Sequence, residues 1–234
     1  FQRIEKILLL VSCVFIAYVV AAFMAGPNWG EVAYATVVPS VSSDPSYISL
    51  VVATIGTTIA PWMIFLAQSN VVDKHATEED LTLQRIDAVS GSVTADIIAW
   101  FIIITTGTVL FPAGIKIADA ADAALALEPI AGEFSTVLFA SGLVAASFLA
   151  ACVLPGVTSS AICEAFGWER GADRTWEEAP VYRGLITGIV AVSAVLVLLP
   201  GVDLFQIMMI SQVINGVLLP VVLVFLVFIA QDKH

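Results

Sequence analysis

Charged residues are scarce in this chain. They make up 12% of its 234 residues, whereas hydrophobic residues make up 59%. A soluble domain carries about twice that charged fraction. The chain also lacks the segments of about ten alternating polar and apolar residues that a membrane β-barrel requires. These two absences exclude an ordinary soluble domain and a barrel, and the repeated long apolar runs indicate an all-α, polytopic membrane protein.

Residues that carry chemistry are few as well. The three cysteines, Cys13, Cys152 and Cys163, have no metal-binding spacing, and neither histidine, His75 nor His234, lies in an apolar run. No nucleophile–base pair is visible, so we expect neither an enzyme nor a bound cofactor. The acidic residues cluster between the apolar runs, which argues against a nucleic-acid partner. The partner that the composition indicates is the lipid bilayer.

Six apolar runs approach or exceed the roughly 20 residues that a bilayer requires. We expect residues 1–234 to form a single membrane domain with six transmembrane helices, at about 4–24, 48–73, 86–111, 132–163, 182–199 and 204–230. The chain begins at the edge of its first run without a visible signal peptide. We therefore expect it to be the C-terminal portion of a larger protein, whose earlier helices complete it.

The basic residues are unevenly distributed between the two sides that six spans define. Only Lys116 falls on the side away from the termini. The others fall on the side of the termini: Arg3, Lys6, Lys74, Arg85, Arg170, Arg174, Arg183 and Lys233. The positive-inside rule then predicts that both ends are cytoplasmic, in a cell (inner) membrane.

The second apolar run contains residues that break a helix. Gly56 has low helix propensity, and Pro61 has no N–H to pair with the carbonyl of Thr57. We expect two half-helices with open backbone at 56–61, an arrangement that forms cation sites in secondary transporters. The alternative is a proline kink that neighbouring helices satisfy.

Three polar side chains lie in other apolar runs. Asp96 is interpreted as a carboxylate on an ion path, or as a paired or hydrated one. Gln212 and Asn215 lie three residues apart and share a helix face, where they would meet a cation or bond to a neighbouring helix. The polar residues 158–160 are interpreted as helix packing.

Four segments resemble the Nramp family of divalent-metal transporters. The segment from Phe1 to Ala33 is similar to that family's fifth helix and following loop. ATIGTTIAPWMIFLAQSNVV is similar to its unwound sixth helix, RIDAVSGSV to the start of the seventh, and ISQVINGVLLPVVLV to the tenth. The resemblance implies helices five to ten of a LeuT-type inverted-repeat transporter. The first helix of the family, with its Asp-Pro-Gly-Asn metal motif, is not in this chain.

The sixth-helix motif departs from the family pattern. The family has Met-Pro-His where this chain has Ala60, Pro61 and Trp62. That difference resembles the prokaryotic Nramp-related magnesium transporters. The resemblance implies a metal site with the Thr57 carbonyl and the Gln212 amide oxygen, and with Ala60 at the position of the family methionine. It also implies an ion path lined by Asp96, Asn215 and Trp62.

Three functions stay open. The favoured hypothesis is transport of divalent metal ions by alternating access, with Mg²⁺ preferred, Mn²⁺ accepted and no proton coupling. Tryptophan at the family's histidine position cannot titrate, and alanine offers no soft thioether ligand. The first alternative is a proton-coupled Mn²⁺/Fe²⁺ Nramp transporter. The second is an Nramp-like membrane sensor or scaffold without transport.

Overall fold

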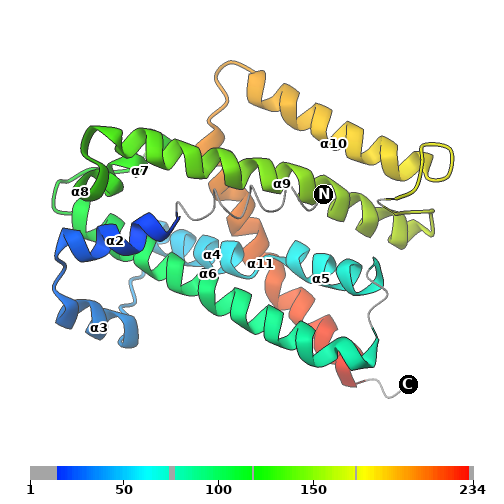
Figure 1. The fold of residues 1–234 in the computed structure, drawn as a ribbon, viewed down its shortest axis with the longest axis horizontal. Helices are drawn as coiled ribbons and strands as arrows, with labels where there is room; N and C mark the ends of the chain where they lie inside the picture. Colours follow the sequence, from blue (N-terminus) through cyan, green and yellow to red (C-terminus); the bar gives the residue numbers. More distant parts are fainter. Residues whose placement is uncertain (1–14, 74–76, 118, 172, 232–234) are drawn as a thin grey trace. The chain divides into compact units, whose positions relative to one another are not determined.

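Every regular element in the described part of the chain is a helix (Figure 1). A computed structural model describes residues 15–73, 77–117, 119–171 and 173–231, without the side chains of Asn70, Asp73 and Glu78. In chain order the elements are α2 (Ile16–Ala25), α3 (Trp29–Val37), α4 (Pro45–Thr58), α5 (Pro61–Asp73), η2 (Glu78–Asp80), α6 (Leu81–Val109), α7 (Ala120–Ala124), η3 (Leu125–Leu127), α8 (Glu128–Ala131), η4 (Gly132–Phe134), α9 (Ser135–Phe166), α10 (Pro180–Leu198) and α11 (Leu204–Gln231).

Five of these stretches are long and apolar enough to cross a membrane. They are Pro45–Ser69, Leu81–Val109, Ala120–Phe166, Pro180–Leu198 and Leu204–Gln231. The first expected span, residues 4–24, lies outside the described residues up to residue 14 and continues as the apolar helix α2. Large apolar side chains are exposed along these helices, among them Phe225 and Phe228 of α11. The expected class, an all-α polytopic membrane protein, is confirmed.

The described helices group into two compact units. Unit 1 is formed by Phe1–Ser40 and Thr77–Ala150, and unit 2 by Val41–Ala76 and Ala151–His234. In unit 1, α2 packs along α6, and the buried Thr105 hydroxyl donates a hydrogen bond to the Tyr18 carbonyl at 3.0 Å. In unit 2, the principal helix pair is α4 with α11. The broken span and the tenth-helix segment of the family therefore belong to one unit.

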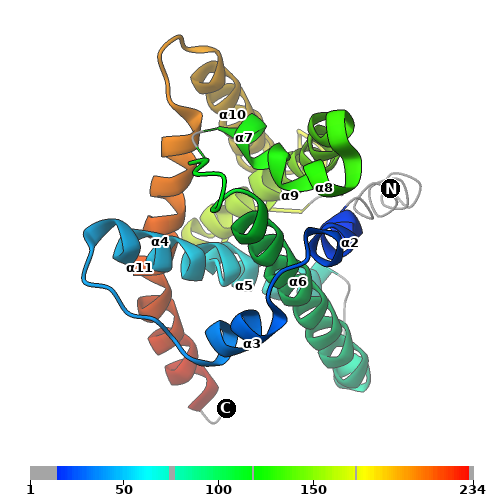
Figure 2. The ribbon, with the colours of Figure 1, turned by 90° about the vertical axis from the view of Figure 1, so that its left-hand side faces the viewer.

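The loop expected at 25–47 contains a helix, α3. Its N-cap is Asn28, whose side-chain oxygen accepts a hydrogen bond from the Gly30 N–H at 3.1 Å. The Trp100 indole N–H donates to the Thr36 hydroxyl at 3.0 Å and ties α3 to α6, beside which it lies (Figure 2). An asparagine before a short amphipathic run is a helix-start signal, but nine residues give too little periodicity to separate a helix from a loop.

Prolines do not interrupt the longest helices. α9 runs for 32 residues through Pro155, and α11 runs for 28 residues through Pro220. Each proline removes one rung of the hydrogen-bond ladder, and membrane helices tolerate that loss where neighbouring groups or local adjustments satisfy the carbonyl. A proline therefore predicts a missing rung, and it predicts a break only where the backbone also leaves the helical region.

The charged connection between α9 and α10 is held by its own contacts. The guanidinium of Arg183 donates to the Arg174 carbonyl from both Nε, at 3.0 Å, and a terminal nitrogen, at 2.6 Å. Arg170 forms an ion pair with Glu164. Tyr182, near the start of α10, is buried against Cys163 of α9. These contacts fix the start of α10 against the end of α9 within unit 2.

Candidate functional site: the broken span and its partner helix

The broken span is interrupted over two residues. Ile59 follows α4 with φ −127° and ψ 74°, and its N–H still donates to the Ile55 carbonyl at 3.0 Å. Ala60 is irregular, and Pro61 begins α5, which follows α4 in roughly the same direction (Figure 1). Sequence reasoning expected the interval 56–61. The helix runs further, to Thr58, and the bond from the Ile59 N–H closes its last turn. The Thr58 hydroxyl donates to the Thr54 carbonyl at 2.8 Å, so this polar side chain is satisfied within the helix.

The proline at the break frees a main-chain carbonyl. Residue 61 would donate its N–H to the Thr57 carbonyl in a continuous helix, and Pro61 has none. Pro61 itself is well placed, because the first position of a helix needs no N–H donor. The Thr57 carbonyl lies in the last turn of α4, where helix carbonyls carry partial negative charge. It is a hard, neutral oxygen of the kind that suits Mg²⁺, Ca²⁺ and Mn²⁺.

Two glycines bring α4 and α11 together at this turn. Gly56 is buried, and a Cβ atom placed on it would lie 2.0 Å from the Gln212 backbone oxygen and 2.4 Å from the Gly216 nitrogen. Only a residue without a side chain fits there. The contact therefore places Gln212 beside the residue that precedes Thr57. Sequence reasoning found Thr57 and Gln212 but missed the glycine pair, whose signal is a small residue in each of two apolar helices.

The two amides of α11 bond to each other. The Asn215 side-chain nitrogen donates to the Gln212 side-chain oxygen at 3.3 Å, and both residues are half-buried. Their spacing of three residues had placed them on one helix face, and the hydrogen bond shows that the side chains meet. An amide oxygen has two lone pairs. The Gln212 oxygen can therefore accept from Asn215 and still face a cation.

A pocket of about 410 Å³ opens beside the break within unit 2. The pocket is lined by Pro61, Trp62 and Asn215 together with one face of α9. Trp62 is half-buried. Among the α9 residues is Thr158, which sequence reasoning had assigned to helix packing. Ala60 is 2% exposed, so neighbouring atoms enclose its methyl group.

Asp96 lies on α6, in unit 1, with an exposed side chain. Unit 2 contains the remaining expected site residues: Thr57, Ala60, Trp62, Gln212 and Asn215. In the part of the chain that the structure describes, no three His, Cys, Asp or Glu side chains are grouped as metal ligands. The oxygens that the described residues bring to the break include the Thr57 carbonyl, the side-chain amide oxygens of Gln212 and Asn215, and the Thr158 hydroxyl in the pocket.

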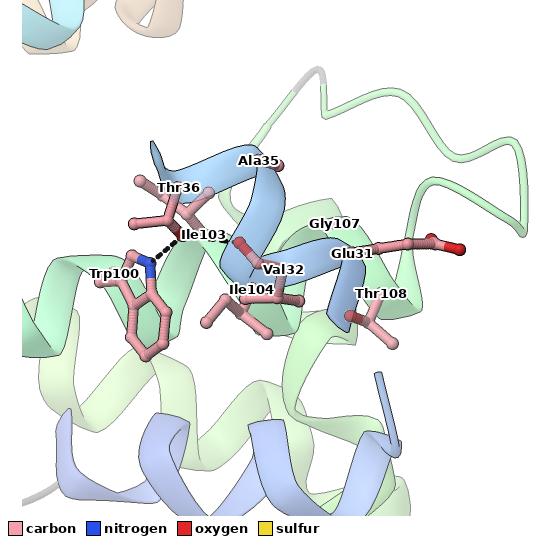
Figure 3. Close-up of a pocket in the computed structure, with 9 residues that line it drawn as sticks. All are labelled: Glu31, Val32, Ala35, Thr36, Trp100, Ile103, Ile104, Gly107 and Thr108. Carbon is pink, nitrogen blue, oxygen red and sulfur yellow. Dashed lines mark hydrogen bonds between the residues drawn. The ribbon is translucent and has the colours of Figure 1, made fainter. Parts of the chain in front are cut away.

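The second large pocket belongs to unit 1 and gathers none of the expected site residues. It has a volume of about 510 Å³ and lies between α3 and α6. Figure 3 shows the Trp100–Thr36 hydrogen bond at one end and the Glu31 carboxylate directed away from Trp100. Its lining also includes Val32, Ile103 and Ile104. Apolar side chains of α3 and α6 therefore form most of the lining of this pocket.

The fold and the break define a class: a polytopic helical membrane protein with a discontinuous span packed against a second helix at a pair of glycines. The model of the family described as "Natural resistance-associated macrophage protein-like" (Nramp) matches residues 1–234. The chain belongs to the Nramp family.

The chain is similar to curated proteins named "Divalent metal cation transporter MntH". It is 28% identical over 231 residues to the one from Caldanaerobacter subterraneus, covering 96% of this chain and 52% of that protein. It is 24% identical to the one from Clostridium acetobutylicum, covering 93% of this chain and 49% of that protein. Against the one from Mesorhizobium japonicum, it is 28% identical, covering 100% of this chain and 53% of that protein. The chain therefore spans about half the length of the curated relatives it matches.

Proposed function

We propose that this chain is part of a membrane transporter that carries divalent metal ions by alternating access, with Mg²⁺ preferred and Mn²⁺ accepted. Family membership and relatives named as divalent metal cation transporters support the metal as substrate. One observation carries the proposal: Thr57, whose carbonyl loses its α-helical donor to Pro61, directly follows Gly56, which meets the Gln212 backbone. The ion would bind Thr57 through its carbonyl and Gln212 through its amide oxygen, directly or through water.

The preference for Mg²⁺ rests on residue 60. The family resemblance places a methionine there, and this chain has a buried alanine. A thioether favours softer ions, whereas carbonyls, amides and water suit Mg²⁺ and Mn²⁺ alike. Mg²⁺ dehydrates reluctantly and keeps several waters when it binds. A site of neutral oxygens therefore removes the advantage that a soft ion gains from sulfur.

The absence of proton coupling rests on residue 62. Trp62 stands where the family has a histidine and lines the pocket with Asn215. Tryptophan cannot take up or release a proton, and neither histidine of the sequence lies in an apolar run. Uptake would then be driven by the gradient of the metal ion and by the membrane potential. The Asp96 carboxylate would contribute to the ion path from α6.

Liposomes that contain a metal-sensitive dye and a pH dye test ion preference and coupling together. We expect Mg²⁺ uptake without lumenal acidification, and competition by Mn²⁺. Metal-dependent acidification, or Mn²⁺ uptake that excess Mg²⁺ leaves unchanged, would return the protein to the proton-coupled Mn²⁺/Fe²⁺ class. A full-length protein that carries no divalent ion would support the sensor alternative.

The Ala60→Met substitution tests the selectivity argument directly. It should raise Mn²⁺ uptake relative to Mg²⁺ uptake, because it adds a soft ligand at the break. Ala179→Met is the matched control, since Ala179 is also a buried alanine of unit 2 and lies at the start of α10. The control carries the same risk of overpacking, and its ratio of Mn²⁺ to Mg²⁺ uptake should stay at the parent value.

The proposed orientation places both ends of this segment in the cytoplasm, from eight basic residues on their side and one on the other. Ser42 then lies outside the cell, in the loop before α4. A cysteine introduced at Ser42 should react with an impermeant thiol reagent added to intact cells. Reaction only after the cells are opened would reverse the orientation.

A further inference from the structure

The main chains of α4 and α11 approach closely where the two helices cross. A glycine of each helix meets the backbone of the other helix. A Cβ atom on Gly216 would lie 2.3 Å from the Val52 backbone oxygen and 2.8 Å from Val52 Cγ1. The reciprocal contact joins Gly56 to the Gln212 oxygen and the Gly216 nitrogen. At this contact, glycine on each helix leaves no Cβ to separate the backbones.

We propose that Gly56 and Gly216 are positioning residues for the metal site. Neither glycine carries a side-chain donor. Their role is to set the distance between Thr57, which follows Gly56, and Gln212, whose backbone oxygen Gly56 meets. This inference rests on the proposed function, and it names the pair of residues on which the spacing of the two ligands depends.

Gly56 meets α11 at one of the backbone hydrogen bonds of that helix. The Gln212 oxygen and the Gly216 nitrogen are four residues apart and are partners within an α-helix. The hydrogen atom that Gly56 carries in place of Cβ points toward this hydrogen bond, as in the Cα–H···O contacts that recur where helices cross. A methyl group at Gly56 would press on the backbone of α11, which cannot rotate away as a side chain can.

The displacement that a methyl group forces can be bounded. Cβ atoms essentially never approach other heavy atoms within 3.0 Å, and this one would start at 2.0 Å from the Gln212 oxygen. The helices must therefore separate by about 1 Å, about twice the tolerance of a preorganised binding site. Thr57 moves with α4 and Gln212 with α11, so the gap between their oxygens widens.

A wider gap changes which ion fits. Mg²⁺ binds oxygen at about 2.0–2.1 Å in a strict octahedron, whereas Ca²⁺ accepts about 2.3–2.6 Å in flexible geometries. Separation of the helices should therefore weaken the binding of Mg²⁺ more than the binding of Ca²⁺. A crossing that only supported the fold would lower the amount of folded protein and leave the ion preference unchanged. Ion preference is therefore the property that separates positioning from structural support.

The experiment compares Gly56→Ala and Gly216→Ala with Gly188→Ala in the full-length protein, reconstituted in liposomes. Gly188 is a glycine of α10 in unit 2, and a Cβ on it would meet nothing within 4 Å. The three substitutions share the same gain in helix propensity. Metal-dependent uptake is measured at matched amounts of folded protein, with Mg²⁺ as substrate and Ca²⁺ as competitor.

We expect Gly56→Ala and Gly216→Ala each to raise the KM for Mg²⁺ by about tenfold or more and to make Ca²⁺ a stronger competitor. Gly188→Ala should stay within about twofold of the parent. An unchanged KM and ion order in the two crossing variants would overturn the inference. Failure of both variants to fold would overturn it too, because the crossing would then serve the fold. If the parent carries neither Mg²⁺ nor Mn²⁺, it is the proposed function that fails.

Discussion

The Pro61→Ala substitution isolates the contribution of the freed carbonyl. It gives residue 61 an N–H that can pair with the Thr57 carbonyl four residues earlier. For that bond to form, Ile59 must leave its φ of −127° and ψ of 74° and return to the helical region. The variant can then exchange between the broken span and a continuous helix. Only the broken form offers the Thr57 carbonyl to an ion.

The expected magnitude follows from the one hydrogen bond that the substitution adds. An intramolecular backbone hydrogen bond contributes about 0.5–1.5 kcal/mol net. Where the two forms are otherwise balanced, a ligand that binds only the broken form loses affinity in proportion to the fraction that is broken. The apparent affinity for Mg²⁺ should then fall by about threefold to about tenfold. A complete loss of binding would exceed what one hydrogen bond accounts for.

The control is Pro45→Ala. Pro45 occupies the first position of α4 as Pro61 occupies the first position of α5. Both substitutions remove a proline ring from a helix start and change the entropy of the unfolded chain in the same way. The residue four before Pro45 is Val41, which lies outside any described helix. Pro45→Ala therefore adds an N–H without closing a break.

The assay is the KM for Mg²⁺ uptake in liposomes, with thermal unfolding as the measure of folding. Pro61→Ala should raise KM and leave the unfolding temperature at or above that of the parent, since a helix gains a hydrogen bond. Pro45→Ala should leave KM unchanged. A parent-like KM in Pro61→Ala, with the N–H shown to be bonded by slow hydrogen exchange, would refute the role of the Thr57 carbonyl.

Three further predictions concern single side chains. Gln212→Ala should weaken Mg²⁺ uptake by an amount on the order of 1 kcal/mol. The control Ser211→Ala removes an exposed hydroxyl from the neighbouring residue and should leave uptake unchanged. Equal uptake by both variants would contradict a binding role for Gln212. Asp96→Asn should abolish uptake while the protein folds normally if this carboxylate lines the ion path, and loss of the folded protein would indicate a paired carboxylate instead. The backbone N–H and the hydroxyl of Thr175 donate to the Glu178 carboxylate and lower the pKa of that carboxyl. The resulting stabilisation is present above the ordinary carboxyl pKa and is lost as pH falls through the lowered value, so the difference in unfolding temperature between the parent and Thr175→Ala should disappear in acid.

Local sequence was enough to anticipate the interruption of the second span and the shared helix face of the two amides. Pro61 predicted the interruption because the loss of an N–H is a local property of the sequence. The two amides were placed on one face by their spacing, and the Asn215–Gln212 bond is of the kind that this spacing allows. Each of these inferences involves residues within one turn of each other.

The limits of the break and the helix crossing depend on more than local sequence. The low helix propensity of Gly56 predicted that the half-helix ends there, but α4 continues to Thr58 and is closed by the bond from the Ile59 N–H to the Ile55 carbonyl. Gly56 was interpreted as a helix breaker, whereas it is a helical residue in contact with α11. Only the packing of two helices far apart in the chain shows why a glycine is needed there.

The proposed ligands make the spacing of main chains the central property of this site. A carbonyl cannot be changed by substitution of its own residue, so the geometry at Thr57 is set by the residues around it. Pro61 frees that oxygen, and Gly56 sets its distance from Gln212 through a contact that no side chain interrupts. Ala60 would act by its small size, since it is buried and offers no donor. Selectivity would then depend on residues that never touch the ion, and the substitutions that alter it most should be those that add atoms at Gly56, Ala60 and Gly216.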